Sequence, residues 1–318
     1  MTQEVSAVAG DQLAGHRILV TGGAGLIGRT VVDDLVARGA EVSVLEVGEP
    51  RGAAKDAVEG RWLVGSVSDA RFVRDAVEGM DAVVHLAGRA GLDQGEPAEI
   101  YEANALGTFL MLDAAAQAGA RKVVYASSIN ASGLPLNSRP VLPTRYPWDE
   151  TEPADIDDAY SLSKQANEAA GAAVAARYGL AVTGIRFPLV RDITVDDGTV
   201  FAQHIRRAMR EDPRRQACEG WTYLDVRDAA RAVFAALTHS TPAAPGILVA
   251  NPLTYLRQDT ETALRRFAPE VPRASVPGRH VPVVLARSED LLGFRASITL
   301  DDLGAQLLVD LDDAEGLA

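Results

Sequence analysis

The stretch at residues 21–28 reads TGGAGLIG and follows directly on a short apolar run, residues 16–20. Its glycines Gly22, Gly25 and Gly28 form the pattern G-x-x-G-x-x-G. Glycine permits a tight turn here, and it leaves no Cβ to keep a pyrophosphate away from the backbone. An amphipathic segment at 26–38 comes next, so the free N–H groups at its start would face the phosphates. The stretch therefore predicts a strand, a phosphate-binding loop and a helix, which together begin a dinucleotide-binding unit.

Short apolar runs alternate with helical stretches on both sides of this unit. We predict strands at 16–20, 41–45, 61–64, 82–86, 122–126, 181–186 and 246–250, and helices at 26–38, 69–78, 99–118, 159–178, 201–210 and 226–237. Such alternation is typical of a parallel sheet with helices on both faces. The runs VVHLA and KVVYA suit strands that are buried on both faces. We therefore predict an α/β fold, namely a doubly wound parallel Rossmann sheet with a smaller C-terminal substrate lobe.

The composition narrows the classes of function. The 318 residues include 44 acidic and 31 basic side chains, which gives a net charge of −13. Such a surface repels nucleic acid and anionic lipid. The single cysteine, Cys218, cannot form an intramolecular disulfide, and the histidines show no metal-ligand spacing. The sequence also has no apolar run long enough to span a membrane. Taken together, these features lead us to expect a cytoplasmic protein with no metal and with no nucleic-acid or membrane partner.

Glu46 ends the second predicted strand and lies at the right distance from the glycine loop to contact a dinucleotide. A carboxylate there accepts hydrogen bonds from both hydroxyls of the adenosine ribose and repels a 2′-phosphate. This favours NAD over NADP, although Arg51 lies close by and could serve a 2′-phosphate. We assign Leu26 and Ile27, which open the helix after the loop, to the same cofactor site.

Tyr160 and Lys164 stand at positions i and i+4 of YSLSK, on one face of the predicted helix 159–178. A nearby ammonium favours the phenolate, so we expect Lys164 to lower the pKa of Tyr160 and make it a usable acid or base. Ser128 follows the strand 122–126 at a carboxyl edge, where it could hydrogen-bond the reacting oxygen. Combined with the glycine loop, these residues predict an oxidoreductase site.

Five prolines interrupt residues 134–153, and Tyr146 and Trp148 lie between them. Prolines at this density exclude a regular helix or a central strand. A loop of this length inside a compact domain is typically functional. We therefore predict a lid whose two aromatic side chains cover the substrate.

The chain resembles an extended short-chain dehydrogenase/reductase of the NAD-dependent epimerase/dehydratase kind, from about residue 16 to residue 294. The resemblance is carried by TGGAGLIG, DAVVHLAG (81–88), NALGT (104–108), YASS (125–128), YSLSK (160–164) and YLDVRDAA (223–230). It implies that Tyr160 exchanges a proton with the substrate while the nicotinamide exchanges a hydride. It also implies that Lys164 holds the nicotinamide ribose and that Ser128 orients the substrate hydroxyl or carbonyl. Further cofactor residues implied by the resemblance are Ser66, Val67, Leu86, Ala87, Gly88 and the structural Asn104.

Departures from the family's pattern bear on the substrate. Ile129 and Asn130 stand where the family's sugar dehydratases carry Asp-Glu, so dehydration is not expected. Leu189 and Trp221 lie where nucleotide-sugar enzymes often carry an asparagine and an arginine. Four arginines lie in a region where they could replace those groups: Arg191, Arg206, Arg207 and Arg214.

We therefore predict an NAD-dependent oxidoreductase that acts on a secondary alcohol or ketone of a sugar, sugar acid or similar polyol-like substrate. The alternative is a nucleotide-sugar epimerase that retains NAD. A non-catalytic dinucleotide-binding sensor is a third reading, which the presence of Ser128, Tyr160 and Lys164 disfavours.

The predicted organisation has four parts: a mobile leader (1–15), an NAD-binding domain with the catalytic helix (16–190), a mainly substrate-binding lobe (191–300) and an acidic tail that frays (301–318). Small residues on the helices 99–118 and 159–178 allow close packing between helices. In relatives these two helices pair across a two-fold axis, which implies a homodimer.

Overall fold

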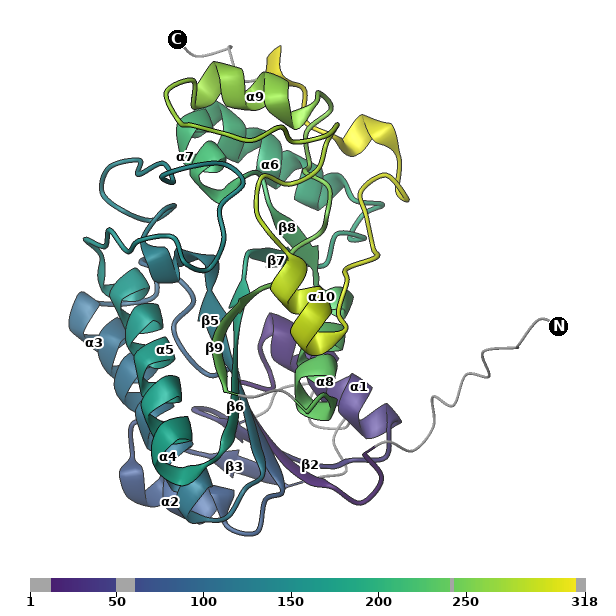
Figure 1. The fold of residues 1–318 in the computed structure, drawn as a ribbon. Helices are drawn as coiled ribbons and strands as arrows, with labels where there is room; N and C mark the ends of the chain where they lie inside the picture. The colour runs from purple at the N-terminus through teal and green to yellow at the C-terminus, as the bar shows by residue number, and fades with distance from the viewer. Residues whose placement is uncertain (1–12, 50–60, 241–242, 313–318) are drawn as a thin grey trace, which may run out of the picture.

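The computed structural model describes residues 13–49, 61–240 and 243–312. Its centre is a seven-stranded sheet in the order β3-β2-β1-β4-β5-β6-β9, and every neighbouring pair is parallel (Figure 1). The strands are β1 (Arg17–Thr21), β2 (Glu41–Glu46), β3 (Trp62–Val64), β4 (Ala82–His85), β5 (Lys122–Ser128), β6 (Ala181–Phe187) and β9 (Ala244–Leu248). The strand order reverses between β1 and β4, which is where doubly wound sheets bind ligands. The predicted fold class is confirmed.

Helices cover both faces of the sheet. On one face lie α1 (Leu26–Ala37) and α8 (Val226–Thr238), and on the other lie α2 (Ala70–Val77), α4 (Gly107–Gln117) and α5 (Ala159–Tyr178) (Figure 1). Neighbouring residues of one strand therefore enter different cores, so that Val20 packs with α1 and α8 while Leu19 packs with α2 and α4. This explains why these strands are continuous apolar runs.

A smaller lobe lies over the carboxyl edge of the sheet (Figure 1). It contains α6 (Thr199–Glu211), α7 (Pro213–Glu219), α9 (Thr260–Phe267), and a parallel pair formed by β7 (Leu189–Arg191) and β8 (Tyr223–Asp225). Helix α10 (Ala286–Leu292) returns towards the sheet and packs beside α8. The lobe has its own hydrophobic core, which sequence patterns alone did not divide from the main one.

The predicted lid is wrong. Tyr146 and Trp148 are each 1% exposed and belong to the hydrophobic core of the lobe. The Tyr146 hydroxyl donates to the carbonyl oxygen of Ala217 at 2.7 Å, and the Trp148 backbone N–H donates to that of Pro282 at 3.2 Å. Because these rings are more stable in an apolar core than over an open cleft, they fasten the loop to the lobe instead of covering a substrate, and within the loop it is Leu136 that lines the cavity.

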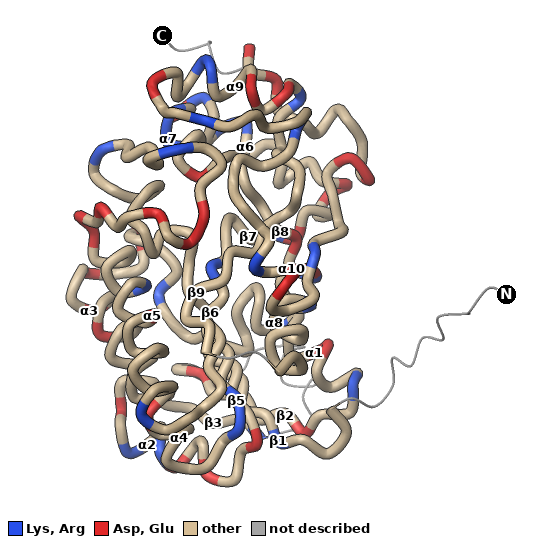
Figure 2. Tube along the Cα trace, in the orientation of Figure 1, with Lys and Arg blue, Asp and Glu red and all other residues tan. Residues whose placement is uncertain are grey.

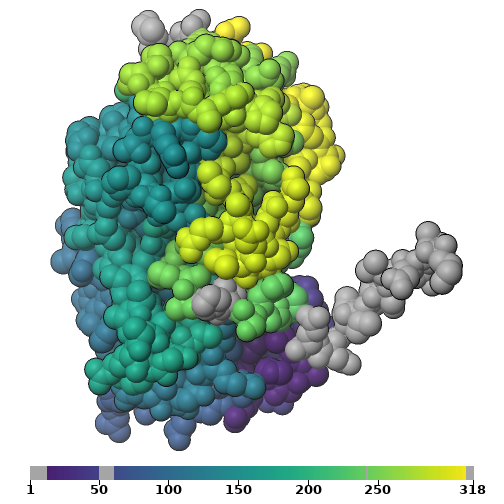
Figure 3. Space-filling model, viewed as in Figure 1, coloured from purple at the N-terminus to yellow at the C-terminus, as the bar shows by residue number. Residues whose placement is uncertain are grey.

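Two further expectations change. The segment 99–118 is not one regular helix but α3 (Pro97–Tyr101), a π-helical turn (Glu102–Leu106) and α4. Within the acidic stretch after residue 300, the described residues do not fray, because Leu307, Leu308 and Val309 are buried in the lobe. Figure 3 shows these C-terminal residues, in yellow, packed along the lobe. Residues 1–12 of the predicted leader, Arg51 and residues 313–318 lie outside the described part.

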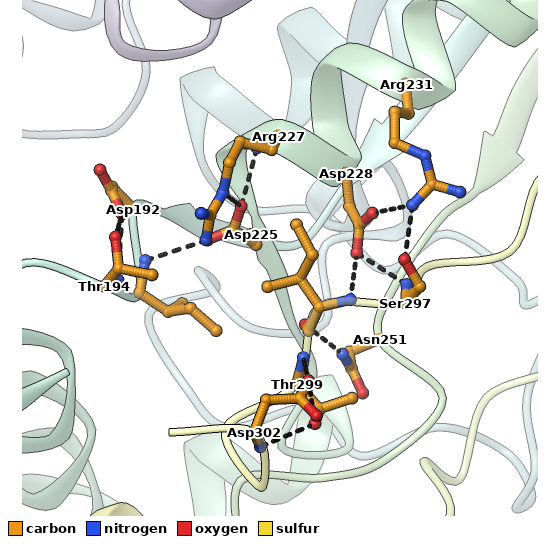
Figure 4. A network of polar contacts seen from close by, with 12 residues as sticks. Asp192, Thr194, Asp225, Arg227, Asp228, Arg231, Asn251, Ser297, Thr299 and Asp302 are labelled. Carbon is orange, nitrogen blue, oxygen red and sulfur yellow. Dashed lines mark hydrogen bonds and ion pairs between the residues drawn. The ribbon is translucent and has the colours of Figure 1, made fainter. Parts of the chain in front are cut away.

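The acids of YLDVRDAA are structural anchors at the start of α8 (Figure 4). Asp225 is fully buried, accepts from the backbone N–H of Ile193 at 3.2 Å and pairs with Arg227. Asp228 is also fully buried, and it accepts from the backbone N–H groups of residues 297 and 298 at 2.8 and 2.9 Å. Together they tie the start of α8 to two separate passages of the chain, one at Ile193 and one at residues 297 and 298.

The surface carries intermixed charge. Basic and acidic residues alternate over both the sheet domain and the lobe (Figure 2). No helix among the described residues is both long enough and apolar enough to cross a membrane.

Candidate active site

The glycine loop is closed by backbone contacts that exclude side chains. A Cβ added at Gly28 would lie 2.0 Å from the carbonyl oxygen of Gly22, and one added at Gly22 would lie 2.7 Å from the backbone nitrogen of Ala87. Gly22 also has φ +72°, a conformation that glycine adopts without strain. The N-cap of α1, Gly25, has no side-chain capping bond, so the first N–H groups of the helix stay available to an anion.

Glu46 lies where the loop meets the end of β2. Its carboxylate accepts a hydrogen bond from the backbone N–H of Ala24 at 2.6 Å. This bond fixes the acid beside the phosphate loop, and Glu46 is among the residues that line the cavity.

A cavity of about 1230 Å³ runs from this loop along the carboxyl edge of the sheet and under the lobe. It is large enough for a dinucleotide together with a small second molecule. The predicted residues that line it are Gly22, Gly25, Leu26, Ile27, Gly28, Glu46, Ser66, Val67, Leu86, Ala87, Gly88, Ser128, Tyr160 and Lys164. Fourteen of the fifteen predicted site residues are thus brought together, and the fifteenth, Asn104, lies behind the cavity wall.

Asn104 holds the strand end that forms this wall. Its amide oxygen accepts from the backbone N–H of Arg89 at 2.7 Å, and its amide nitrogen donates to the Arg89 carbonyl at 3.0 Å and to the Ser163 hydroxyl at 3.1 Å. Ser163 belongs to α5, the helix that carries Tyr160 and Lys164. The Asn104 side chain therefore fixes the distance between the predicted cofactor strand and the predicted catalytic helix.

His85 is satisfied in the core beside this wall. Its ring nitrogens lie 2.7 Å from the hydroxyl oxygen of Thr21 and 3.1 Å from that of Thr108. Burial, followed by the charge of Lys164, lowers the pKa of His85 to about 3, so the ring is neutral. Thr21 also accepts from the backbone N–H of Ala87 at 3.1 Å, which positions the backbone that faces the cavity.

Ser128, Tyr160 and Lys164 line the same cavity and are almost fully buried. The Lys164 ammonium lies 5.5 Å from the centre of the Tyr160 ring and donates to the carbonyl oxygen of Ala126 at 3.0 Å. The Ser128 hydroxyl donates to the side-chain oxygen of Asn130 at 2.8 Å and accepts from the Asn130 backbone N–H at 3.2 Å. Asp158 caps α5 through the backbone N–H of Ser161, so the helix begins just before the Tyr160 side chain.

The acid–base properties differ from the expectation. Burial raises the pKa of Tyr160, and a hydrogen bond from Ser128 opposes that effect only in part. Burial also lowers the pKa of Lys164 to about 8. The predicted fall in the Tyr160 pKa is therefore wrong, because burial, which disfavours the charged phenolate, is the dominant effect on this tyrosine.

The structure separates the four candidate arginines. Only Arg191 of the four lines the cavity. Arg206 donates to the carbonyl oxygen of Gln306, while Arg207 and Arg214 pair with Glu211 and Glu270.

Sequence reasoning missed several polar residues that also line the cavity, and three of them lie under the lobe: His204, Gln216 and Glu219. They come from α6 and α7, which no motif marked as functional. A helix-period pattern over 201–210 does place His204 and Ala208 on one helical face, but it does not show what that face meets.

A dinucleotide-binding sheet with a buried serine, tyrosine and lysine in one cavity defines an enzyme of the Rossmann oxidoreductase class. Residues 18–250 match the model of the NAD dependent epimerase/dehydratase family. The chain belongs to this family. The expected family, its NAD dependence and its enzymatic nature are thereby confirmed.

Individual relatives differ in what they are named for. Cinnamoyl-CoA reductase 1 of Petunia hybrida is 28% identical over 275 residues, which covers 82% of this chain and 80% of that protein. Sterol demethylase protein B of Methylococcus capsulatus is 34% identical over 116 residues, and the match spans only 36% of this chain and 35% of that protein. UDP-glucose 4-epimerase of Streptomyces lividans is 30% identical over 183 residues, which cover 54% of this chain and 51% of that protein.

Solved structures agree on the fold. A short-chain dehydrogenase/reductase superfamily protein of Agrobacterium tumefaciens with bound NAD has a TM-score of 0.68, with 23% identity over 92% of this chain and 97% of that one. UDP-glucose 4-epimerase of Thermotoga maritima, solved with UDP-glucose, has a TM-score of 0.63, with 21% identity over 92% of this chain and 97% of that one. At these identities the likeness establishes the fold alone.

Proposed function

We propose that this chain is an NAD-dependent dehydrogenase or reductase that transfers a hydride at a secondary alcohol or ketone of a sugar, sugar acid or similar polyol-like substrate. The observation that carries the proposal is the burial of Ser128, Tyr160 and Lys164 in the same cavity as the glycine loop. A binding-only sensor has no use for this arrangement, which places a proton donor, its hydrogen-bonding partner and a buried ammonium around one point.

The residues present fit a dinucleotide. The backbone cradle of Gly22 and Gly28 leaves no room for a Cβ, and it opens onto the free N–H groups of α1. Glu46 suits the two ribose hydroxyls and disfavours a 2′-phosphate, which supports NAD over NADP. When bound, NAD supplies the carbon that gives or receives the hydride. The loop would hold the pyrophosphate, and Lys164 would hold the nicotinamide ribose.

The side chains of this protein supply the proton. Tyr160 exchanges a proton with the oxygen of the substrate, and Ser128 hydrogen-bonds the same oxygen. Asn130 holds the Ser128 hydroxyl in place at 2.8 Å. The buried Lys164 ammonium stabilises negative charge as it develops on the Tyr160 oxygen, and it does so strongly because water is excluded.

Dehydration is disfavoured by the same geometry. Ile129 is buried, and the Asn130 side chain is engaged with Ser128, so no carboxylate follows the serine to act as a second acid or base. Epimerisation of a nucleotide sugar is the second candidate, favoured by Arg191, which lines the cavity, pairs with no acid among the described residues and could meet a diphosphate.

We also propose a homodimer. Apolar side chains gather on the outer faces of α3, the π-helical turn, α4 and α5: Tyr101, Leu106, Phe109 and Leu162 are each 40–45% exposed. A face of this kind is typical of a helix-to-helix interface. Light scattering tests it, and a monomer mass at micromolar concentration would contradict the proposal.

The test of function is Tyr160→Phe, with Tyr178→Phe as its matched control. Tyr178 lies at the other end of α5, where its hydroxyl donates to Asp113. We expect Tyr160→Phe to lower NADH formation by about 10²–10⁴-fold and to leave the calorimetric affinity for NAD within about 3-fold. The control should keep full turnover. Turnover that survives in Tyr160→Phe would refute the mechanism.

Native mass spectrometry separates the two candidate reactions. Protein that is purified empty of dinucleotide supports the dehydrogenase, because its NAD must exchange at each turnover. Protein that retains about one NAD per subunit supports the epimerase.

A further inference from the structure

The part of the cavity under the lobe is lined by two pairs of polar residues, one with a basic member and one with an acidic member, which we call its two poles. Arg191, at the end of β7, and His204, on α6, form one pole. Gln216 and Glu219, one turn apart on α7, form the other. Both poles line the same cavity as Tyr160.

Arg191 is a cation without a counterion among the described residues. Its guanidinium donates only to the carbonyl oxygen of its neighbour Val190, at 2.8 Å. Partial burial lowers its pKa, and its charge adds to burial in lowering the pKa of His204. A guanidinium facing a cavity in this state binds a carboxylate or phosphate through charge-assisted hydrogen bonds.

Glu219 is an acid that no described residue hydrogen-bonds through its side chain. Burial raises its pKa to about 7, against the smaller effect of Arg215. Gln216 has its amide oxygen occupied by the Tyr255 hydroxyl at 3.0 Å, so its amide N–H₂ is left for a ligand. The charge of Glu219 acts on Tyr255 and Cys218, whereas that of Arg191 acts on His204.

The acidic pole restricts the size and the charge of the ligand that this part of the cavity can bind. A carboxylate accepts hydrogen bonds from hydroxyl groups and repels phosphates. Trp221, which stands where a diphosphate ligand was expected, is fully buried in the core of the lobe and offers the cavity nothing. A nucleoside diphosphate in this part of the cavity would therefore meet an acid and would find no arginine at position 221.

We propose that the substrate is a monosaccharide-sized sugar acid whose carboxylate binds Arg191 and whose hydroxyls bind Gln216 and Glu219. The inference rests on the proposed function, since it places the reacting hydroxyl of this acid at Tyr160. It names Arg191 as the residue that selects an acid over the neutral sugar, and Glu219 as the residue that rejects a nucleotide sugar.

Galacturonate and galactose test this, because they differ only in a carboxylate in place of the C6 hydroxymethyl group. Each is titrated calorimetrically into the protein saturated with NADH. We expect galacturonate to bind at least about 10-fold tighter than galactose, as expected for one charge-assisted contact. UDP-galactose should bind weaker than either.

Variants test which residues cause the expected preference for galacturonate over galactose. Arg191→Gln should weaken galacturonate binding about 10- to 100-fold and leave galactose unchanged, while Arg191→Lys should keep part of the preference. Arg207→Gln is the matched control, because Arg207 is exposed and pairs with Glu211 on the outside of α6. Glu219→Gln should weaken both sugars alike and strengthen UDP-galactose. Thermal melts show which variants are folded.

Three results would overturn the proposal: equal binding of the two sugars, tighter binding of UDP-galactose by the unmodified protein, or a preference that survives in folded Arg191→Gln. Failure of the proposed function looks different. In that case the binding preference persists while Tyr160→Phe leaves turnover unchanged.

Discussion

Replacing Glu168 by alanine is expected to cost this protein a large part of its stability, because the partner of Glu168 is a buried arginine. Glu168 lies on α5, one turn after Lys164, and faces Arg186 on β6. Two hydrogen bonds join the guanidinium to the carboxylate, both at 2.7 Å. The side chains are only 14% and 8% exposed. The Ser127 hydroxyl donates to the same carboxylate at 2.6 Å.

Without the carboxylate, the hydrogen bonds that Arg186 keeps among the described residues are two long ones, to the Ser132 hydroxyl and the Glu150 carbonyl, both at 3.4 Å. The charge of Glu150 also attracts the guanidinium, but no ion pair joins the two side chains in the described part of the chain. A buried charge left without its partner typically costs about 3–5 kcal/mol. The measurement is urea unfolding followed by circular dichroism, and the expected result is a loss of that size in the free energy of unfolding. The double variant Glu168→Leu with Arg186→Met should recover most of it, since an apolar pair removes the unpaired charge.

Glu211→Ala is the control for this experiment. Glu211 pairs with Arg207 at 3.2 Å, but the two side chains are 63% and 70% exposed, so its loss should cost less than about 1 kcal/mol. If Glu168→Ala costs no more than the control, the buried pair is not holding α5 against β6 and the reasoning fails.

Three more outcomes follow from the site. Gly28→Ala places a Cβ 2.0 Å from the Gly22 carbonyl oxygen and should abolish calorimetric NAD binding, whereas Gly48→Ala, which meets open space, should not. The folded-state pKa of Glu219, about 7, exceeds the ordinary 4.5, so the folded protein binds the extra proton between these values. Stability should fall as pH rises through that window, by up to about 3 kcal/mol, and urea unfolding of Glu219→Gln should lack this fall. Glu46→Ser should reduce the ratio of kcat/KM for NAD to that for NADP by about 10-fold or more, and an unchanged ratio would remove Glu46 from the ribose site.

The sheet domain could be predicted because its motifs are short patterns of residues that are neighbours in sequence. The glycine loop, the strand-end acid and the Tyr160/Lys164 pair are each defined by neighbours in sequence, and a parallel sheet brings strand ends to one edge. That is why nearly all predicted site residues line one cavity. The short strands β7 and β8 and the helices α7, α9 and α10 escaped, because segments of three to eight residues give little periodicity.

The remaining errors have one physical origin, which is burial set by distant residues. Tyr146 and Trp148 bind segments more than a hundred residues away, so their role in the core could not be recognised from the loop itself. The sequence places Lys164 beside Tyr160, but not the desolvation that raises the pKa of the tyrosine. The sequence does not distinguish Arg191 from the other three candidate arginines, and it is the structure that shows which of the four lines the cavity.

The composition of the lobe core has a consequence for the order of folding. Its buried residues come from passages as far apart as Ile129, Tyr146, Phe201 and Leu311. The contacts of Tyr146 with Arg273 and of Trp148 with Val283 close loops of more than a hundred residues. The paired strands of the sheet lie at most 64 residues apart, as between Ile18 and Ala82, and the entropy lost on closing a loop grows with its length. We therefore expect the sheet to form early in refolding and the lobe, with its part of the cavity, to form last. During that interval the glycine loop would be ready for a dinucleotide before the pocket for its partner exists.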